Sequence, residues 1–279
     1  MIHTSRQLKA LVRNLSKCNS AKAQIIIRNY VMERFLERLA LSPYRNNLIL
    51  KGGTLVTAMV GLNNCSTMDV DATVKGMDLS DESVREIISG INAVEIEDGM
   101  TFEIKSIRPI MDEADYPGIR LIMETMLETM RTPLKIDFST GDVITPREVS
   151  YSFKLMFENR AISILTYNLE TLLAEKLETL LTRNTMNTRM RDFYDIFALE
   201  DSHTHTINAE TLRSAFAATL KKRGSSAIVA DADLIIGEVE ADSRLLAMWS
   251  NYQRKFDYAA DISWDMVIGA VKRLSKMAI

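Results

Sequence analysis

A short apolar strand runs directly into an apolar helix in the stretch NLILKGGTLVTAMV, residues 47–60. The glycines at the junction, Gly52 and Gly53, let the backbone approach a ligand closely. Free N–H groups at the start of the helix favour a phosphate there, and the Thr54 hydroxyl adds a donor. A tight strand-to-helix turn explains the same glycines without a ligand, and the stretch is not a Walker A loop. It predicts a strand–turn–helix unit with a candidate phosphate loop that begins at Lys51.

Two carboxylates follow in the alternating segment TMDVDATVK, residues 67–75. Residues i and i+2 of a strand share a face, so Asp69 and Asp71 point the same way while Val70 and Ala72 face the core. Like charges this close repel each other unless a cation lies between them. Oxygen ligands suit Mg²⁺, which takes one or two carboxylates and completes its shell with phosphate and water. The pair predicts a divalent-metal site, and a solvated strand edge is the alternative.

A third carboxylate is expected on the strand at residues 134–138. Apolar residues alternate there, which leaves Lys135 and Asp137 on the opposite face. If this strand neighbours the strand of Asp69, Asp137 completes an acidic triad. The sequence does not decide adjacency, so a solvent-facing Asp137 is the alternative.

A lysine interrupts the leucine stripe of the helix predicted at residues 168–183. Lys176 lies between Leu169 and Leu180 on the apolar side. A buried unpaired ammonium is very costly, so Lys176 has to reach solvent, pair with a carboxylate or line a cleft where an anion binds.

The next predicted helix, at residues 189–199, carries Asp192 and Asp195 as i, i+3 neighbours. Asp192 lies at the margin of an apolar stripe, as Lys176 does on the preceding helix. The two are candidate partners, either in a structural ion pair or in a catalytic arrangement.

Composition limits the class of protein. The chain has 279 residues, 47% hydrophobic and 25% charged, as expected of a globular protein with a substantial core. A net charge of −3 excludes a globally basic nucleic-acid-binding surface but not a local basic patch. No membrane span or secretory signal is visible, and Cys18 and Cys65 form no metal or disulfide pattern. We therefore expect a cytoplasmic protein that does not associate with a membrane.

The order of elements predicts an α+β fold. Helices precede residue 43. Strands, the short helix after Gly53 and a helix at 78–92 fill the region up to residue 167. From residue 168 the pattern is helical almost to the end. We expect an α/β domain at 1–167 with N-terminal helices, and a helical domain at 168–279 that completes the active-site cleft.

Taken together, these motifs resemble the AbiEii nucleotidyl transferase toxin family, which consists of polymerase β-like nucleotidyltransferases. Its members are toxins of bacterial toxin–antitoxin and abortive-infection systems. The resemblance begins at residues 30–39 and runs through LKGGT at 50–54, TMDVD at 67–71, LLAEKLE at 172–178 and RDFYD at 191–195. One departure is Cys65, which stands where the family usually carries an arginine that contacts a substrate phosphate.

The resemblance implies a polymerase β-like core with a mixed sheet and transfer of a nucleotide from a nucleoside triphosphate. Asp69 and Asp71 would hold Mg²⁺ or Mn²⁺, and Asp137 would act as a metal ligand or a general base. Lys176 would contact the triphosphate, with Asp192 orienting the lysine or the nucleotide. The remaining nucleotide contacts would come from Lys51, Gly52, Gly53 and Thr54.

The expected acceptor is an RNA such as a tRNA 3′ end, and the expected protein partner is a cognate antitoxin. An RNA acceptor needs a basic surface, for which the sequence offers Arg183, Arg189, Arg191, Lys221, Lys222 and Arg223. Two alternatives are a small-molecule nucleotidyltransferase of the aminoglycoside-modifying kind and a non-catalytic nucleotide-binding interaction protein.

Overall fold

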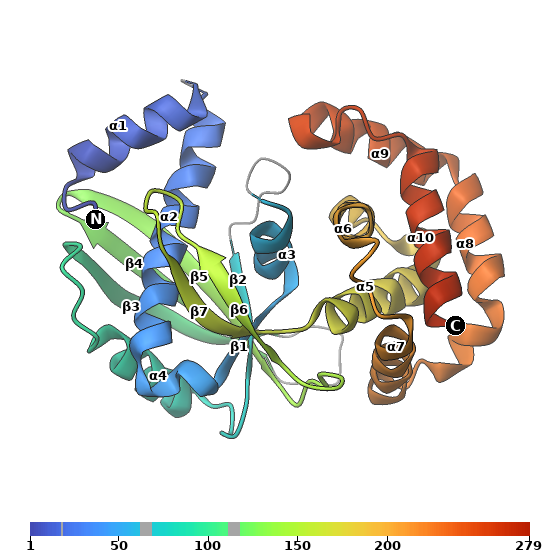
Figure 1. Ribbon diagram of the computed structural model, residues 1–279, viewed down its shortest axis with the longest axis horizontal. Helices are drawn as coiled ribbons and strands as arrows, with labels where there is room; N and C mark the ends of the chain where they lie inside the picture. The colour runs from blue at the N-terminus through green and yellow to red at the C-terminus, as the bar shows by residue number, and fades with distance from the viewer. Residues whose placement is uncertain (18, 62–68, 111–117) are drawn as a thin grey trace. The chain divides into compact units, whose positions relative to one another are not determined.

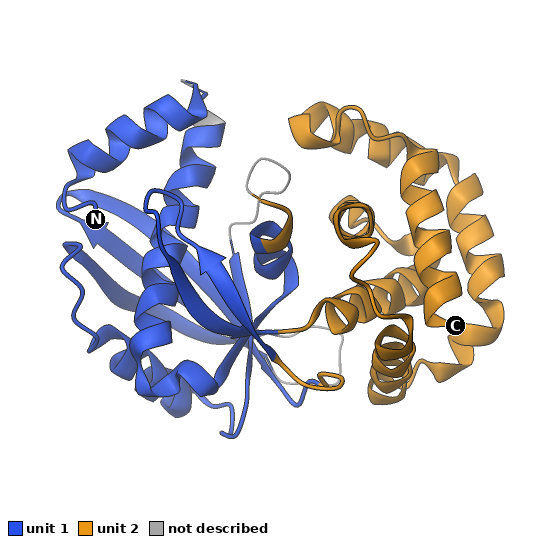
Figure 2. Cartoon of the chain, in the orientation of Figure 1, with its two compact units in different colours: residues 1–58, 66–142, 149–166 blue, residues 59–65, 143–148, 167–279 orange. Residues whose placement is uncertain are grey.

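The computed structural model describes residues 1–17, 19–61, 69–110 and 118–279 (Figure 1). The chain divides into two compact units (Figure 2). Unit 1 consists of Met1–Ala58, Ser66–Asp142 and Val149–Thr166, and unit 2 of Met59–Cys65, Val143–Glu148 and Tyr167–Ile279.

Unit 1 contains a mixed β-sheet, which has seven strands among the described residues, in the order β3-β4-β5-β2-β1-β7-β6. The strands are β1 (Leu48–Lys51), β2 (Asp69–Val74), β3 (Met100–Ile110), β4 (Gly118–Leu127), β5 (Met130–Thr140), β6 (Val149–Lys154) and β7 (Ala161–Thr166). Strands β2 and β5 run parallel, as do β1 and β7, and the other pairs are antiparallel. The mixed sheet with helices before and after it confirms the predicted α+β class.

Helices cover one face of this sheet. They are α1 (Ser5–Ser16), α2 (Ser20–Leu41) and α4 (Asp81–Asn92), and a further helix, α3 (Gly52–Val60), directly follows β1. Side chains of α1, α2 and α4 form one hydrophobic core with Val70, Ala72 and Ile136 of the sheet. Residues alternate between buried and partly exposed along β4 and β5. The charged residues of β2, β4 and β5 therefore lie on the face opposite this core.

The start of α1 is fixed by a capping box. The Thr4 hydroxyl accepts from the Gln7 backbone N–H, and the Gln7 side chain accepts from the Thr4 backbone N–H. Such a box satisfies two donors that a helix start leaves unpaired. The amphipathic sequence of α1 then buries Leu8 and Val12 against the core.

Unit 2 is helical. Its helices are α5 (Leu169–Arg183), α6 (Met190–His203), α7 (Ala209–Arg223), α8 (Ala232–Ala241), α9 (Ser243–Lys255) and α10 (Trp264–Ala278). Short 3₁₀ turns occur in the chain at Pro43–Asn46, Asn184–Met186, Ser226–Asp231 and Asp257–Ala259. Asn168 caps α5 by accepting from the Thr171 N–H at 2.8 Å, and its side-chain amide donates to the Thr145 carbonyl at 2.8 Å. The described residues contain no helix with the length and apolar character needed to cross a bilayer.

The main difference from the sequence prediction is strand β6, which the pattern analysis missed. Its sequence, VSYSFK, has few large apolar residues, and Phe153 is its one buried residue. It lies at the edge of the sheet, where one buried face is not needed to hold a strand in place. Other elements differ from their predictions mainly at the ends. Residues 67–68 of the predicted acidic strand and both cysteines lie outside the described residues.

Candidate active site

A row of charged residues crosses the polar face of the sheet from β1 to β3. In the register of the strands, each residue of this row lies opposite the next: Lys51, Asp71, Asp137, Arg120 and Arg108. Two residues earlier in the same pair of strands, Asp69 of β2 lies opposite Lys135 of β5. The sequence left open whether the two acidic strands are neighbours. In the structure they are hydrogen-bonded to each other, with Asp71 and Asp137 side by side.

The turn between β1 and α3 is packed against the carboxylate of Asp71. Gly52 has a φ of +61°, and a Cβ added to it would lie 2.9 Å from both Cβ and Cγ of Asp71 and closer still to Oδ2. The Gly53 backbone N–H donates to the same carboxylate. Two features therefore require glycine at position 52: its left-handed backbone conformation, and the Asp71 carboxylate in the space that a Cβ would occupy.

The surroundings of Asp71 disfavour its charge. Burial, followed by the negative charges of Asp137 and Asp69, raises the pKa of the Asp71 carboxyl, while Lys51 and the Gly53 hydrogen bond act in the opposite direction. Because the net effect is upward, the ionised form of Asp71 is only partly compensated by the protein. A cation bound here would relieve that cost.

The other two carboxylates already have cationic partners. Lys135 Nζ lies 2.7 Å from Asp69 Oδ2 and 3.5 Å from Asp137 Oδ2. Arg120 donates two hydrogen bonds of 2.8 Å to the Asp137 carboxylate, one from Nε and one from Nη2. Among the described residues, no three acidic, histidine or cysteine side chains gather into a metal-binding group. The three carboxylates of the predicted triad therefore lie on neighbouring strands, but their side chains do not gather around one point.

The donor chemistry of Asp69 and Asp71 fits a hard divalent cation, since both supply carboxylate oxygens from one strand face. Asp71 fits best because its charge is the least compensated. Asp137 fits as a third ligand only if its bidentate hydrogen bonding with Arg120 is broken.

Two residues of the predicted phosphate loop have internal partners. Thr54 is fully buried, and its hydroxyl donates to the Asp69 carbonyl at 2.6 Å. This bond anchors the start of β2 to α3, and a contact of Thr54 with the nucleotide stays a prediction. Lys51 Nζ lies 2.6 Å from Asp142 Oδ2.

Asp142 was missed by sequence reasoning. Its carboxylate also accepts from the Ser139 hydroxyl at 2.7 Å. Burial alone would raise the pKa of Asp142, but the charge of Lys51 and the hydrogen bonds outweigh burial and lower it. The one available signal was the turn at Gly141, with a φ of +74°, which places Asp142 directly after β5.

Lys176 forms an ion-pair cluster within unit 2. Its Nζ lies 3.1 Å from Asp192 Oδ1 and 2.6 Å from Asp195 Oδ2, and Lys176 is 9% exposed. Burial lowers the pKa of Lys176, but the charges of Asp195 and Asp192 outweigh burial and raise it. Asp195, 1% exposed at its side chain, makes the shorter contact, although the sequence pointed first to Asp192.

The basic surface proposed from the sequence is partly neutralised. Arg223 pairs with Glu178 and, at 3.6 Å, with Glu175. Arg191 Nε lies 3.8 Å from Asp195 Oδ2. These two arginines are therefore engaged within unit 2, which weakens the case for this set of residues as an RNA-binding patch.

A family model covers the acidic strand and its glycine turn. The model described as "Nucleotidyl transferase AbiEii toxin, Type IV TA system" matches residues 34–270, most of the chain. The chain belongs to the AbiEii family. As an AbiEii member it is a nucleotidyltransferase of a toxin–antitoxin family. This membership implies a nucleotide substrate and an antitoxin partner, and it argues against a non-catalytic interaction protein.

One solved structure shows a similar fold, and a second aligns with a slightly lower score. JHP933 from Helicobacter pylori aligns with a TM-score of 0.50 and 19% identity over 91% of this AbiEii chain and 93% of its own. A candidate nucleotidyltransferase from H. pylori aligns with a TM-score of 0.49 and 18% identity, over 91% of this chain and 96% of its own. A search of curated proteins finds no match to the chain.

Proposed function

We propose that this AbiEii chain transfers a nucleoside monophosphate from a nucleoside triphosphate to an RNA acceptor, such as a tRNA 3′ end. The cation is Mg²⁺ or Mn²⁺, with Asp69 and Asp71 as its ligands. The observation that carries the proposal is the undercompensated carboxylate of Asp71 directly beneath the Gly52-Gly53 turn. Nucleoside triphosphates are cytoplasmic metabolites, so the proposed reaction belongs to the cytoplasm.

The geometry supports a triphosphate next to the carboxylates. The Gly53 N–H, at the start of α3, donates to Asp71, so the positive end of that helix is directed at the acidic strand. A helix start favours phosphate oxygens through its free N–H groups and its dipole. Asp69 and Asp71 would hold the divalent cation, which would supply positive charge to offset the negative charge around the attacked phosphorus.

The other residues have distinct tasks in the proposal. Gly52 and Gly53 shape the turn, and Thr54 positions Asp69 through its carbonyl. Lys51 contributes positive charge beside Asp71. Asp137 acts as an additional metal ligand or accepts the proton of the attacking hydroxyl once Arg120 releases it.

The roles predicted for Lys176 and Asp192, a triphosphate contact and the carboxylate that orients it, stay predictions. The contacts of Lys176 with Asp192 and Asp195 support the alternative of a structural ion pair within unit 2. Replacement of Lys176 by methionine distinguishes a triphosphate contact from a structural ion pair.

The test of the proposal is incubation of the protein with each of the four labelled nucleoside triphosphates, Mg²⁺ and total RNA. We expect label in RNA with the wild type, none with Asp71→Asn, and wild-type labelling with Asp78→Asn. Asp78 is an exposed carboxylate near the end of β2, so it is a matched control for the loss of one charge.

The alternatives give different results in the same assay. Label found in an aminoglycoside and never in RNA would overturn the RNA acceptor. Nucleotide binding without any pyrophosphate release would overturn transferase activity at this site. Expression of the wild type, but not of Asp71→Asn, should also slow bacterial growth if the transfer is toxic.

A further inference from the structure

The N-terminal helical hairpin has a charge opposite to that of the remaining chain. Residues 1–32 contain six Lys and Arg and no Asp or Glu, whereas residues 33–279 carry a net charge of −9. These 32 residues also precede the match to the family model, which begins at residue 34. We call α1 and the part of α2 up to residue 32 the basic hairpin.

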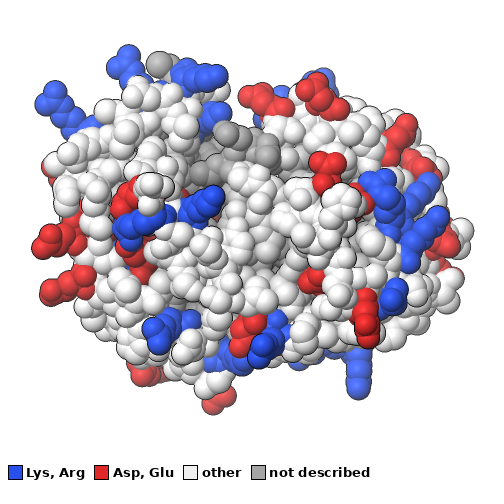
Figure 3. Space-filling model, viewed as in Figure 1, with Lys and Arg blue, Asp and Glu red and all other residues white. Residues whose placement is uncertain are grey.

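The cations of the basic hairpin are exposed and available. Arg6, Lys9, Arg13, Lys17 and Lys22 are all exposed, and none of them takes part in an ion pair within the described part of the chain. Figure 3 shows Lys and Arg side chains without acidic neighbours over the end of the molecule where α1 meets α2. The Glu128 carboxylate accepts from Ser5 at the start of α1, and the charge of Lys9 contributes to the lowered pKa of Glu128. The hairpin itself supplies no carboxylate, and its surplus of cations attracts a polyanion.

Three of these cations project from one side of α1. Arg6, Lys9 and Arg13 follow the spacing i, i+3, i+7, which places them within a narrow arc of the helix and spreads them over about 10 Å along its axis. A linear array of this kind suits a chain of phosphates better than a single small anion.

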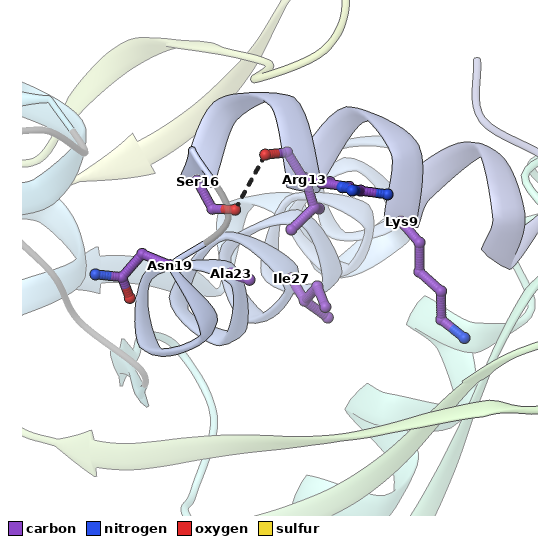
Figure 4. A pocket seen from close by; sticks show the side chains of 7 residues that line it. Lys9, Arg13, Ser16, Asn19, Ala23 and Ile27 are labelled. Carbon is purple, nitrogen blue, oxygen red and sulfur yellow. Dashed lines mark hydrogen bonds between the residues drawn. The ribbon is translucent and has the colours of Figure 1, made fainter.

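A hollow of about 340 Å³ lies between the two helices, beside two of the cations (Figure 4). Its apolar part is formed by Val12, Ala23 and Ile27. Lys9 and Arg13, with two uncharged polar residues of the hairpin, form the remaining lining. The hollow therefore combines an apolar surface, which can accept the face of a base, with cations placed for the adjoining phosphates.

We infer that the basic hairpin binds the RNA acceptor, with the phosphate backbone along Arg6, Lys9 and Arg13 and an unpaired base in the hollow. This inference rests on the proposed function, in which RNA is the acceptor. Proteins commonly bind RNA by holding splayed-out bases on apolar or aromatic surfaces while cations follow the backbone. An acidic protein would also satisfy the cations, so binding of polyglutamate is measured alongside binding of RNA.

The hairpin acts on affinity and not on the chemical step. Helix α2 packs against the apolar face of the sheet, whereas Asp69 and Asp71 lie on the polar face. The hairpin cations are therefore remote from the reacting atoms, and their loss should raise the KM for RNA without lowering kcat.

The first experiment measures binding of a labelled tRNA to the full-length protein by fluorescence anisotropy at several salt concentrations. The variant is Arg6→Gln with Lys9→Gln and Arg13→Gln. The matched control removes three exposed cations elsewhere, Arg85, Lys154 and Lys276, in the same way. At about 0.1 M salt we expect at least tenfold weaker binding for the hairpin variant only. The slope of log affinity against log salt should fall by about 2 to 3, because each lost phosphate contact removes about 0.7–0.9.

The second experiment tests the hollow without a change of charge. Ala23→Leu fills it, and we expect binding of a single-stranded RNA to weaken about tenfold while binding of a fully paired RNA duplex is unchanged. Circular dichroism melting of each variant shows whether the fold is intact, and Ala10→Leu, at an exposed position of α1, is the control for added bulk.

The outcomes separate this inference from the proposed function. If the hairpin variant binds and labels RNA like its control while Asp71→Asn abolishes labelling, the hairpin inference is overturned and the proposed function stands. If the wild type labels no RNA but the hairpin variant still loses RNA affinity, the proposed acceptor fails and the RNA-binding surface stands. Unchanged RNA binding together with lost binding of polyglutamate would overturn the inference in favour of an acidic protein partner.

Discussion

Asp71 of unit 1 and Lys176 of unit 2 are both charged groups held away from solvent, yet their surroundings compensate them in opposite ways. Asp71 lies beside two further carboxylates, and its pKa is raised because burial and like charges disfavour ionisation. Lys176 lies between two carboxylates that favour its charge and raise its pKa in spite of burial. The first group gains from an added cation, whereas the second is already neutralised. The comparison therefore marks the acidic strand as the place for a ligand and favours a structural role for Lys176.

The largest effect is expected for Asp71→Asn. Loss of a metal ligand should reduce nucleotide transfer by about three orders of magnitude, which corresponds to roughly 4 kcal/mol of transition-state stabilisation. In metal-free buffer at pH 7 the free energy of unfolding should stay the same or rise, since one of three neighbouring negative charges is removed. Labelled-nucleotide transfer and urea denaturation measure the two quantities. A variant with full activity would remove Asp71 from the metal site.

Lys176→Met tests the other half of the comparison. If Lys176 is structural, this change removes the closest cation from the buried Asp195, leaves it Arg191 at 3.8 Å, and should lower the free energy of unfolding by about 3–5 kcal/mol. If Lys176 instead serves the triphosphate, stability should change little and transfer should fall by orders of magnitude. Activity has to be measured at low temperature, where the variant is folded. Wild-type transfer in a strongly destabilised protein decides for structure.

Glu33 of α2 tests whether a raised carboxyl pKa by itself identifies a functional site. Burial raises the pKa of Glu33 to about 7, against hydrogen bonds that both carboxylate oxygens accept from the Met156 N–H. Between the unfolded pKa of about 4.5 and the folded pKa of about 7, the folded state holds the proton more tightly. The stability of the wild type therefore falls as the pH rises through this window.

Glu33→Gln should remove that dependence, because glutamine is neutral at every pH and still accepts from Met156. The variant should gain up to roughly 3 kcal/mol over the wild type at pH 8 and much less at pH 5, from about 1.36 kcal/mol per pKa unit. Unfolding by urea at the two pH values measures the gain. Transfer activity should be unchanged, since Glu33 lies in the core face of α2; reduced activity in a stable variant would contradict this.

The smallest effect concerns the space beside Asp71. Gly52 and Gly224 have similar backbones, with φ of +61° and +67°, but an added Cβ meets Asp71 at the first and nothing within 4 Å at the second. Alanine at Gly224 should cost about 1–2 kcal/mol for its left-handed backbone. Alanine at Gly52 should cost about 1–2 kcal/mol more and also reduce transfer, because Asp71 has to move. Equal costs in thermal denaturation would show that the close approach to Asp71 is unimportant.

The predictable part of the site depends on local pattern. The i, i+2 spacing of Asp69 and Asp71 put both on one face, and the periodicity of α5 placed Lys176 among leucines. The contacts that decide charge compensation are not local. Lys135 contacts Asp69 because β5 pairs with β2 on one side. Arg120 hydrogen-bonds to Asp137 because β5 pairs with β4 on the other side. No alternation of residue types reveals which strands become neighbours.

The same limit explains the remaining differences. The internal partner of the Thr54 hydroxyl was not predicted because its burial depends on the strand that α3 packs against. Asp195 looked secondary to Asp192 because the sequence does not show which carboxylate of α6 lies nearer to α5. Strand β6 was missed because an edge strand needs little apolar sequence.

The parallel pairing of β2 with β5 also determines when, during translation, Asp71 and Asp137 can become neighbours. Asp71 and Asp137 are neighbours in the sheet but 66 positions apart in the chain, so the polypeptide has to be synthesised well beyond β2 before they can meet. At about 5–20 residues per second, translation of that interval takes roughly 3–13 s. During those seconds a nascent chain has the glycine turn and the first two carboxylates but not the strand that completes the row. The row of charges on the polar face is therefore incomplete on the ribosome until most of the sheet has been made.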